Sequence, residues 1–237
     1  MAKKNTNPSK SATRTPDTDP GVGFDWQTWI PIILAFVVFS TGLRNEILGI
    51  DDHTATVDNP AVVSFSPFTH FNLGMYAPIT WLFYGIAYAL GKDNAVLYHL
   101  LSLAAHVFNV YLVSKLILRI SGQRGTAFWV ALLFAIHPIQ VESVAWIAGF
   151  STPLYALFFL LSCNWYLDYA EKPEEKRAYT LALTAFVLAC LSKSAAVTLP
   201  LVLVLLDWWT GRPVLDRKRI MGYAPFFAFA LFFGALT

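Results

Sequence analysis

The stretch AVLYHLLSLAAHVFNVYLVSKLIL, residues 95–118, contains a single charged residue, Lys115. It is longer than the roughly 20 apolar residues that a helix needs to cross the hydrocarbon core of a bilayer. The whole chain has a similar character, because 56% of its 237 residues are hydrophobic and only 14% are charged. Soluble domains normally carry more charge than this. The sequence therefore predicts an integral membrane protein.

Apolar segments recur along the chain, separated by short polar or Pro/Gly breaks. They lie at about 26–43, 95–118, 125–138, 150–168, 178–192, 195–209 and 222–237. We expect an all-α, polytopic membrane bundle of about seven transmembrane helices. Several segments are short enough to form buried helices in a soluble protein, so length alone leaves both classes open. Residues 1–25 are polar and predict a disordered tail, which leaves 26–237 as one transmembrane domain.

The distribution of positive charge favours the membrane. If the tail is cytoplasmic and each segment crosses once, fourteen of the 17 Lys and Arg residues fall on the inner side. Only Arg44, Lys92 and Lys193 fall outside, as the positive-inside rule predicts. We therefore expect a bacterial inner-membrane protein with a cytoplasmic N-terminus. The net charge of +2, with no basic patch, gives no support to a nucleic-acid partner.

The loop at 44–94 is the longest and contains its own apolar piece, APITWLFYGIAYALG, at 77–91. Pro78 and Gly91 bound this piece, which is rich in Trp and Tyr. These features are typical of a helix lying at the membrane interface. Counting it as a crossing would reverse every later loop and remove the charge bias. We expect the loop to be extracytoplasmic.

The same loop carries GIDDHTATVDNP at 49–60, which sets Asp51 and Asp52 beside His53 just beyond the first span. Neighbouring carboxylates close to hydrocarbon repel each other, so one of them resists ionisation. Such a carboxylate can act as a general base on a hydroxyl. The alternative is a pair of solvated acids in an ordinary loop, followed by a turn at Asp58.

A second extracytoplasmic loop, AIHPIQVESVAWIAG at 135–149, holds His137 and Glu142. Pro138 breaks the helix before the loop, so both side chains can point back over the first loop. Alternatively, His137 caps a helix end and Glu142 is solvated. Lys193 lies between two apolar runs on the same side. A cation at that depth either has an anionic partner, such as a lipid phosphate, or snorkels to the headgroups.

Polar residues inside the predicted spans have structural interpretations. His99 and His106 share one face of the second span, and a haem between histidines would need an opposing histidine that no other span interior offers. Hydrogen bonds between helices, with Asn109 nearby, are the interpretation we adopt. Asp207 precedes two tryptophans and is interpreted as an anchor at the inner interface, without a chemical role.

Taken together, DDHTATVDNP, PITW, YHLLSLAAHVFN, FAIHPIQVESVAWIAG, LSK and VTLPLVLVLLDWW resemble the transmembrane and tetratricopeptide-repeat proteins. These are integral-membrane GT-C glycosyltransferases of the O-mannosyltransferase-like kind. The resemblance covers nearly all of residues 45–212, in the family's order. It implies a GT-C-like fold with a long first extracytoplasmic loop.

The resemblance also implies a polyprenyl-phosphate-linked sugar donor and an extracytoplasmic hydroxyl acceptor. Asp51 and Asp52 would supply the base. The residues lining the substrate site would be His53, His137 and Glu142, with Lys193 facing the donor phosphate. No cofactor is predicted. A divalent cation held by Asp51, Asp52 and His53 together with His137 or Glu142 is an alternative that the resemblance does not require.

Two departures from the family pattern define a second hypothesis. Where the family continues HPxxVESVAW with an acidic-Arg-Lys-Asp run, this chain has Gly149, Phe150, Ser151 and Thr152. The sequence also ends in the apolar FFAFALFFGALT at 226–237 without the further helices and repeats of the family, as expected for a fragment or a shortened descendant. The alternative function is a catalytically inactive membrane subunit that packs its aromatic-rich helices against other proteins or pigments in a larger complex. Membrane lipids are expected partners in either case.

Overall fold

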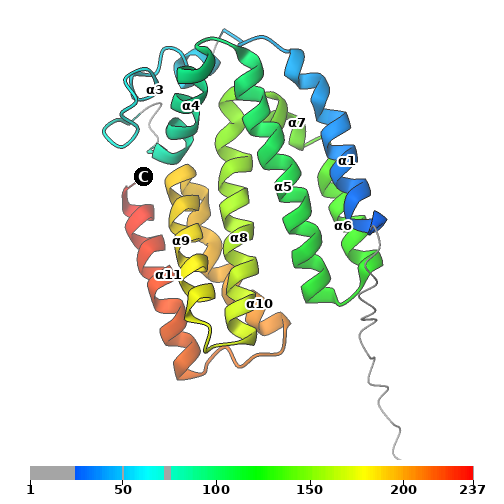
Figure 1. The fold of residues 1–237 in the computed structure, drawn as a ribbon. Helices are drawn as coiled ribbons and strands as arrows, with labels where there is room; N and C mark the ends of the chain where they lie inside the picture. Colours follow the sequence, from blue (N-terminus) through cyan, green and yellow to red (C-terminus); the bar gives the residue numbers. More distant parts are fainter. Residues whose placement is uncertain (1–24, 50, 72–75, 237) are drawn as a thin grey trace, which may run out of the picture.

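The computed structural model describes residues 25–49, 51–71 and 76–236, and every regular element in these ranges is a helix (Figure 1). The predicted tail at 1–25 lies, apart from Asp25, outside the described residues. The helices are α1 (Trp26–Ser40), η1 (Thr41–Arg44), α2 (Asp51–Ala55), α3 (Pro60–Val63), α4 (Pro78–Gly91), α5 (Ala95–Ser121), α6 (Arg124–Ile136), α7 (Gln140–Ala145), η2 (Ile147–Phe150), α8 (Ser151–Glu171), α9 (Lys176–Ser192), η3 (Ser194–Thr198), α10 (Leu199–Trp209) and α11 (Arg217–Leu236).

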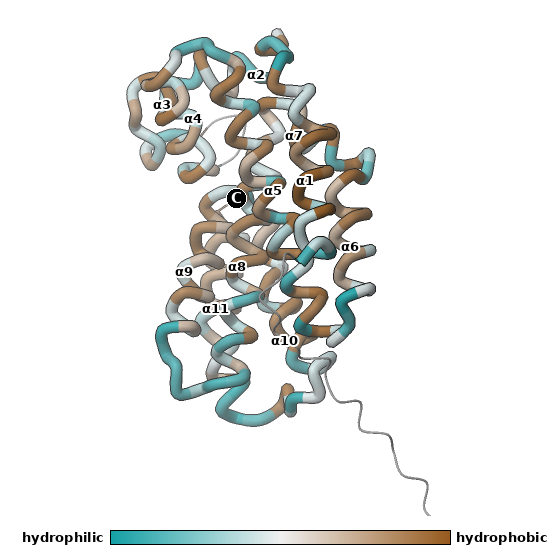
Figure 2. The backbone as a smooth tube through the Cα atoms, turned by 45° about the vertical axis from the view of Figure 1, so that its right-hand side comes forward, coloured by the Kyte–Doolittle hydropathy of each residue, from teal (hydrophilic) through white to brown (hydrophobic). Residues whose placement is uncertain are grey.

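Four helical stretches are long and apolar enough to cross a membrane. They are Trp26–Arg44, Ala95–Ser121, Ile147–Glu171 and Arg217–Leu236. The shorter apolar helices Arg124–Ile136 and Ser194–Trp209 lie beside them, as does α9 (Figure 1). Each predicted apolar segment thus forms a helix, and a span count of seven stays a prediction. The chain is brown with apolar residues along the bundle and teal with polar ones at both ends (Figure 2), as a membrane body requires.

The loops alternate between the two ends of the bundle (Figure 1). The start of α1 lies at the same end as the turns that follow α5, α8 and α10. The opposite end, here called the cap end, carries α2, α3, α4 and α7. The loops assigned to the inner side by their basic residues therefore gather at one end, here called the basic end. Which side of a membrane each end faces stays a prediction.

Local signals explain where the central helix α5 begins and ends. The Asn94 side chain accepts a hydrogen bond from the backbone N of Val96 at 3.2 Å and so caps its first turn. Gly122 closes the other end with a φ of 66°, a conformation that glycine adopts without strain. The helix therefore extends three residues beyond the predicted segment.

Polar groups inside the bundle join neighbouring helices. His106 Nε2 lies 3.0 Å from the carbonyl oxygen of Ala135 on α6, and Asn109 Nδ2 donates to the carbonyl oxygen of Pro153 on α8 at 2.8 Å. The expected hydrogen bonds between helices are thus confirmed for these two residues. The ring nitrogens of His99 are buried and make no hydrogen bond with any described residue.

Helix α4 forms at the predicted place and packs on top of the bundle. Its Thr80 hydroxyl donates to the carbonyl oxygen of Ser192, the last residue of α9, at 3.0 Å. Pro78 occupies the first helical turn, where its missing N–H costs no hydrogen bond. The helix thus covers the end of α9 without being one of the candidate spans, and its position at an interface stays a prediction.

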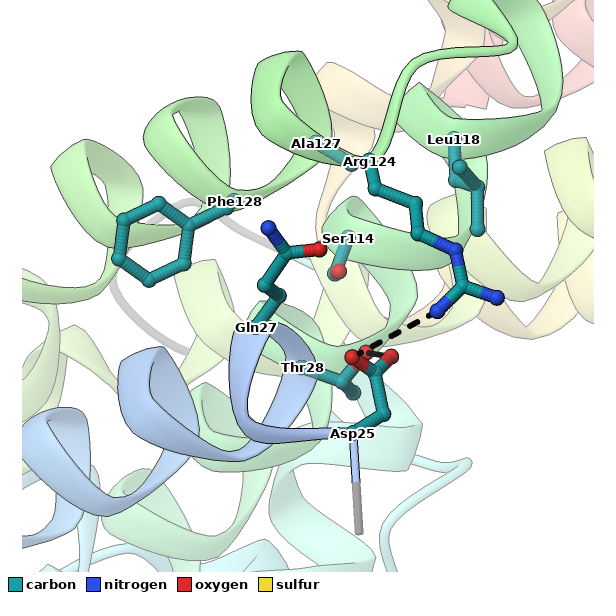
Figure 3. A pocket seen from close by; sticks show the side chains of 8 residues that line it. All are labelled: Asp25, Gln27, Thr28, Ser114, Leu118, Arg124, Ala127 and Phe128. Carbon is teal, nitrogen blue, oxygen red and sulfur yellow. Dashed lines mark hydrogen bonds and ion pairs between the residues drawn. The ribbon is translucent and has the colours of Figure 1, made fainter. Parts of the chain in front are cut away.

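At the basic end, Asp25 at the start of α1 meets Arg124 at the start of α6 (Figure 3). The carboxylate and guanidinium are 3.9 Å apart, and the Thr28 hydroxyl also donates to Asp25 at 2.6 Å. The cavity between these helices measures about 10 Å³, which is room for about one water molecule. The Asp25–Arg124 ion pair joins the starts of α1 and α6, and the cavity beside it is too small for a ligand.

Candidate functional site

The two adjacent acids of the first loop have different surroundings. Asp52 is 1% exposed, and both of its carboxylate oxygens accept backbone hydrogen bonds. Oδ1 accepts from the N of Ala148 at 2.9 Å, and Oδ2 accepts from the N of Leu48 at 3.0 Å. Asp52 therefore fastens the first loop to η2, and its oxygens are already occupied.

Helix α4 supports this junction from the other side. The buried hydroxyl of Tyr84 donates to the carbonyl oxygen of Ile147, next to the backbone group that binds Asp52. Burial raises the pKa of Tyr84 well above its usual value, and the negative charge of Asp52 adds to the shift. Tyr84 thus stays a neutral donor at physiological pH and holds η2 beneath the first loop.

Asp51, by contrast, lines a cavity of about 190 Å³ at the cap end. The other side chains and backbone around it come from α7, η2, the start of α8 and the end of α9. The lining residues are Asp51, Glu142, Ser143, Trp146, Ala148, Gly149, Ser151, Thr152 and Lys193. The cavity therefore joins two carboxylates, one ammonium group and three hydroxyls within a volume that suits part of a small ligand.

Lys193 is held in place and partly removed from water. It follows the last residue of α9, and its Nζ donates to the Thr152 hydroxyl at 2.8 Å. Burial lowers the pKa of Lys193, while the negative charge of Glu142 opposes the shift. The ammonium thus has an acid nearby, but its hydrogen bond goes to the neutral hydroxyl of Thr152. An additional anion in the cavity would therefore stabilise the partly buried ammonium of Lys193.

Gly149 shapes the cavity through a close backbone contact. A Cβ at this position would lie 2.6 Å from the carbonyl oxygen of Glu142 and 3.3 Å from the Cα of Ser143. Glycine therefore lets η2 pack directly against α7. The sequence indicated a loss of charge at Gly149, Ser151 and Thr152. In the structure, Gly149 allows a close turn, and Ser151 and Thr152 supply two hydroxyls to the cavity.

The two histidines lie outside this lining. His53 is half-buried on α2, where its carbonyl oxygen accepts from the N of Asp58 at 2.8 Å. His137 is exposed at the end of α6, and its Nδ1 accepts from the N of Ile139 at 3.1 Å. This second arrangement matches the capping alternative stated for His137. The cavity thus brings together Asp51, Glu142 and Lys193 and leaves Asp52, His53 and His137 outside its lining.

Trp146, Ser143, Ser151 and Thr152 line the cavity and were not predicted as site residues. Their only sequence signal is their place next to Glu142 and at the start of the α8 apolar run. No group of three or more His, Cys, Asp or Glu side chains could hold a metal ion within the described ranges. The divalent-cation alternative therefore has no ligand set there.

No protein-family model matches the chain, and no solved structure matches it significantly. Curated relatives do match. Human "Protein O-mannosyl-transferase TMTC1" is 31% identical over 188 residues, which is 68% of this chain and 21% of the relative. Mouse TMTC3 is 31% identical over 48% of this chain and 12% of the relative.

Mouse "Protein O-mannosyl-transferase TMTC2" is 29% identical over 51% of this chain and 16% of the relative. The chain thus spans about a fifth or less of the length of these proteins. The identity extends over about half of the chain or more and agrees with the resemblance carried by its motifs. The chain is therefore a relative of the TMTC protein O-mannosyl-transferases, an O-mannosyltransferase-like family.

Proposed function

We propose that this chain forms the reaction centre of a GT-C-type membrane glycosyltransferase. Its donor would be a sugar carried on a polyprenyl phosphate, and its acceptor a hydroxyl outside the cytoplasm. The observation that supports this most is the cavity at the cap end, where Asp51, Glu142 and Lys193 meet. The relatives are named as protein O-mannosyl-transferases, and these names supply the class of reaction.

The reaction requires one general base and one site that stabilises the departing anion. The acceptor oxygen attacks the anomeric carbon of the sugar, and the bond from that carbon to the phosphate oxygen breaks. The phosphate leaves with the bonding electrons, and the Asp51 carboxylate takes the acceptor's proton. Lys193, oriented by Thr152, stabilises the negative charge of the leaving phosphate. Attack opposite the leaving group inverts the anomeric configuration.

A lipid-linked donor also suits the place of the cavity. The polyprenyl chain stays in the membrane, so its phosphate and sugar reach only the headgroup region. A cavity at the end of an apolar bundle lies at that depth. Asp52 has a positioning role in this proposal, because it holds the backbone of Ala148, which lines the cavity.

The test is sugar transfer by the purified protein from polyprenyl-phosphate mannose to a Ser/Thr peptide. Asp51→Asn removes the base and leaves a side chain of similar size, so turnover should fall by about 100-fold or more. Asp58→Asn is the matched control, because Asp58 is an exposed acid of the same loop outside the cavity lining. Unchanged turnover in Asp51→Asn would reject Asp51 as the base.

The second candidate is a catalytically inactive subunit of a larger membrane complex. The uncharged run at 149–152 favours it, as do large aromatic side chains exposed on the bundle, among them Trp26 on α1 and Trp129 on α6. Purification from native membranes separates the two proposals. Stoichiometric partner subunits together with no sugar transfer would support the inactive subunit.

A further inference from the structure

A second cavity of about 190 Å³ lies at the basic end, between the end of α8 and the start of α11. It has the same volume as the candidate site but lies at the other end of the bundle. Its lining includes Tyr166, Tyr169, Asp216, Lys218 and Arg219. Nothing in the proposed sugar transfer uses this cavity.

Two of the lining side chains, Tyr166 and Arg219, belong to a buried ionic cluster around Asp207, which is 0% exposed. Its carboxylate accepts from Arg219 at 2.9 Å, from the Tyr223 hydroxyl at 2.6 Å and from the Tyr166 hydroxyl. Arg212 Nη1 lies 3.4 Å from the same carboxylate. Asp207 is thus a buried junction of α8, α10 and α11, where the sequence suggested only an interface anchor.

The segment around the cavity keeps a surplus of positive charge. Residues 207–219 contain four Arg and Lys residues and two Asp residues, which leaves an excess of two positive charges. Asp207 faces two arginines, and the Asp216 side chain accepts from the backbone N of Lys218 at 3.2 Å. The Lys218 ammonium and the Tyr169 hydroxyl make no ion pair or hydrogen bond with any described residue. The cavity thus offers an unpaired cation and a free hydroxyl donor.

Exposed tryptophans place this cavity at headgroup depth. Trp208 and Trp209 follow Asp207 directly and are 65% and 63% exposed. Trp209 Nε1 donates to the carbonyl oxygen of Ile120 at the end of α5, so its ring is fixed at that level. Tryptophans at the ends of apolar helices mark the membrane–water interface. Because Arg219 binds Asp207, the cavity lies near the same depth.

The cavity also has apolar walls. Ala170 and Pro173 line it together with the charged side chains. A ligand here would meet cationic and hydroxyl groups beside apolar ones. Inorganic phosphate would contact only the polar groups, whereas the headgroup and glycerol of a phospholipid would contact both.

We propose that the cavity at the basic end binds the phosphate headgroup of an anionic phospholipid from the adjacent leaflet. Basic cavities between membrane helices are suited to such headgroups, and a Lys or Arg that contacts the headgroup contributes about a fivefold gain in affinity. Lys218 and Tyr169 contact the phosphate. Arg219, held by Asp207, adds its remaining donors.

The experiment uses delipidated, purified protein in a nonionic detergent at low salt. Native mass spectrometry measures the binding of phosphatidylglycerol and of phosphatidylcholine with the same acyl chains. We expect phosphatidylglycerol to bind more tightly, and Lys218→Ala to weaken its binding about fivefold. Tyr169→Phe should weaken it as well. Arg217→Ala is the matched control, because it removes one adjacent positive charge outside the cavity lining and should change binding less than twofold.

Lys218 and Arg217 are both exposed, so replacing either should leave the fold intact. Thermal unfolding of each variant verifies this. Equal loss of binding in Lys218→Ala and Arg217→Ala would overturn the proposal in favour of general charge attraction. Equal affinity for the two lipids would also overturn it. Displacement of phosphatidylglycerol by inorganic phosphate at millimolar concentration would assign the cavity to a soluble anion instead.

Discussion

Replacing Asp52 by Ala should destabilise the protein far more than the same change at Asp51, the residue beside it. Asp52→Ala removes hydrogen bonds from two backbone N–H groups, of Leu48 and Ala148, to a carboxylate that is 1% exposed. A hydrogen bond to a charged group contributes about 1.5 kcal/mol or more, so the loss should total about 3 kcal/mol. The Asp51 side chain makes no hydrogen bond with any described residue, so its replacement should lower the free energy of unfolding by less than about 0.5 kcal/mol.

The measurement is thermal unfolding in detergent, followed by circular dichroism. For a chain of this length, 1 kcal/mol corresponds to about 2 to 4 °C in Tm, so Asp52→Ala should lower Tm by about 6 to 12 °C. Asp51→Ala should lower it by less than about 2 °C. Turnover in sugar transfer should not follow Tm across the variants, because Asp51→Asn should lose turnover while its Tm stays unchanged. Equal Tm values for the two alanine variants would refute the assignment of Asp52 as the fastening residue.

Three further predictions concern other parts of the chain. Gly149→Ala should destabilise by about 1 to 3 kcal/mol, because its Cβ would meet the carbonyl oxygen of Glu142; Gly222→Ala, with open space around its Cβ, should be neutral or stabilising in the same melts. Asp207→Asn should destabilise by about 3 kcal/mol by leaving two arginines without their anion, and a wild-type Tm would contradict this. Donor binding, measured as KM, should weaken as pH rises through the lowered pKa of Lys193, because the neutral amine no longer attracts phosphate; Lys193→Arg should abolish this alkaline change, since a guanidinium stays charged.

The main helices follow from the sequence because a bilayer leaves few alternatives. Backbone groups in hydrocarbon must bond within their own segment, so each long apolar run forms a helix. The helix predicted at 77–91 is found at Pro78–Gly91, where Pro and Gly mark its ends. Helices α2, α3 and α7 are only four to six residues long and were not predicted, since so short a segment shows no periodic pattern.

The candidate site was only partly predictable. Charged residues on the loops of one end of a bundle can meet, and Asp51, Glu142 and Lys193 do. Asp52 has a structural role and Asp51 lines the cavity because only Asp52 binds the backbone N–H of Ala148. That group lies 96 residues away in the sequence, so no local pattern reveals the contact. The junction at Asp207 likewise joins residues from three helices.

The central claim is that the cavity with Asp51 opens outside the cytoplasm, opposite the basic end. Two exposed glutamates provide matched reporters, Glu142 at the cavity and Glu174 in the turn between α8 and α9. Each is replaced singly by cysteine, while Cys163 and Cys190 stay buried and unreactive. Intact cells are then treated with a membrane-impermeant maleimide. The account predicts labelling of Glu142→Cys in intact cells and of Glu174→Cys only after the membrane is opened; labelling of both from the same side, or in the reverse order, would contradict it.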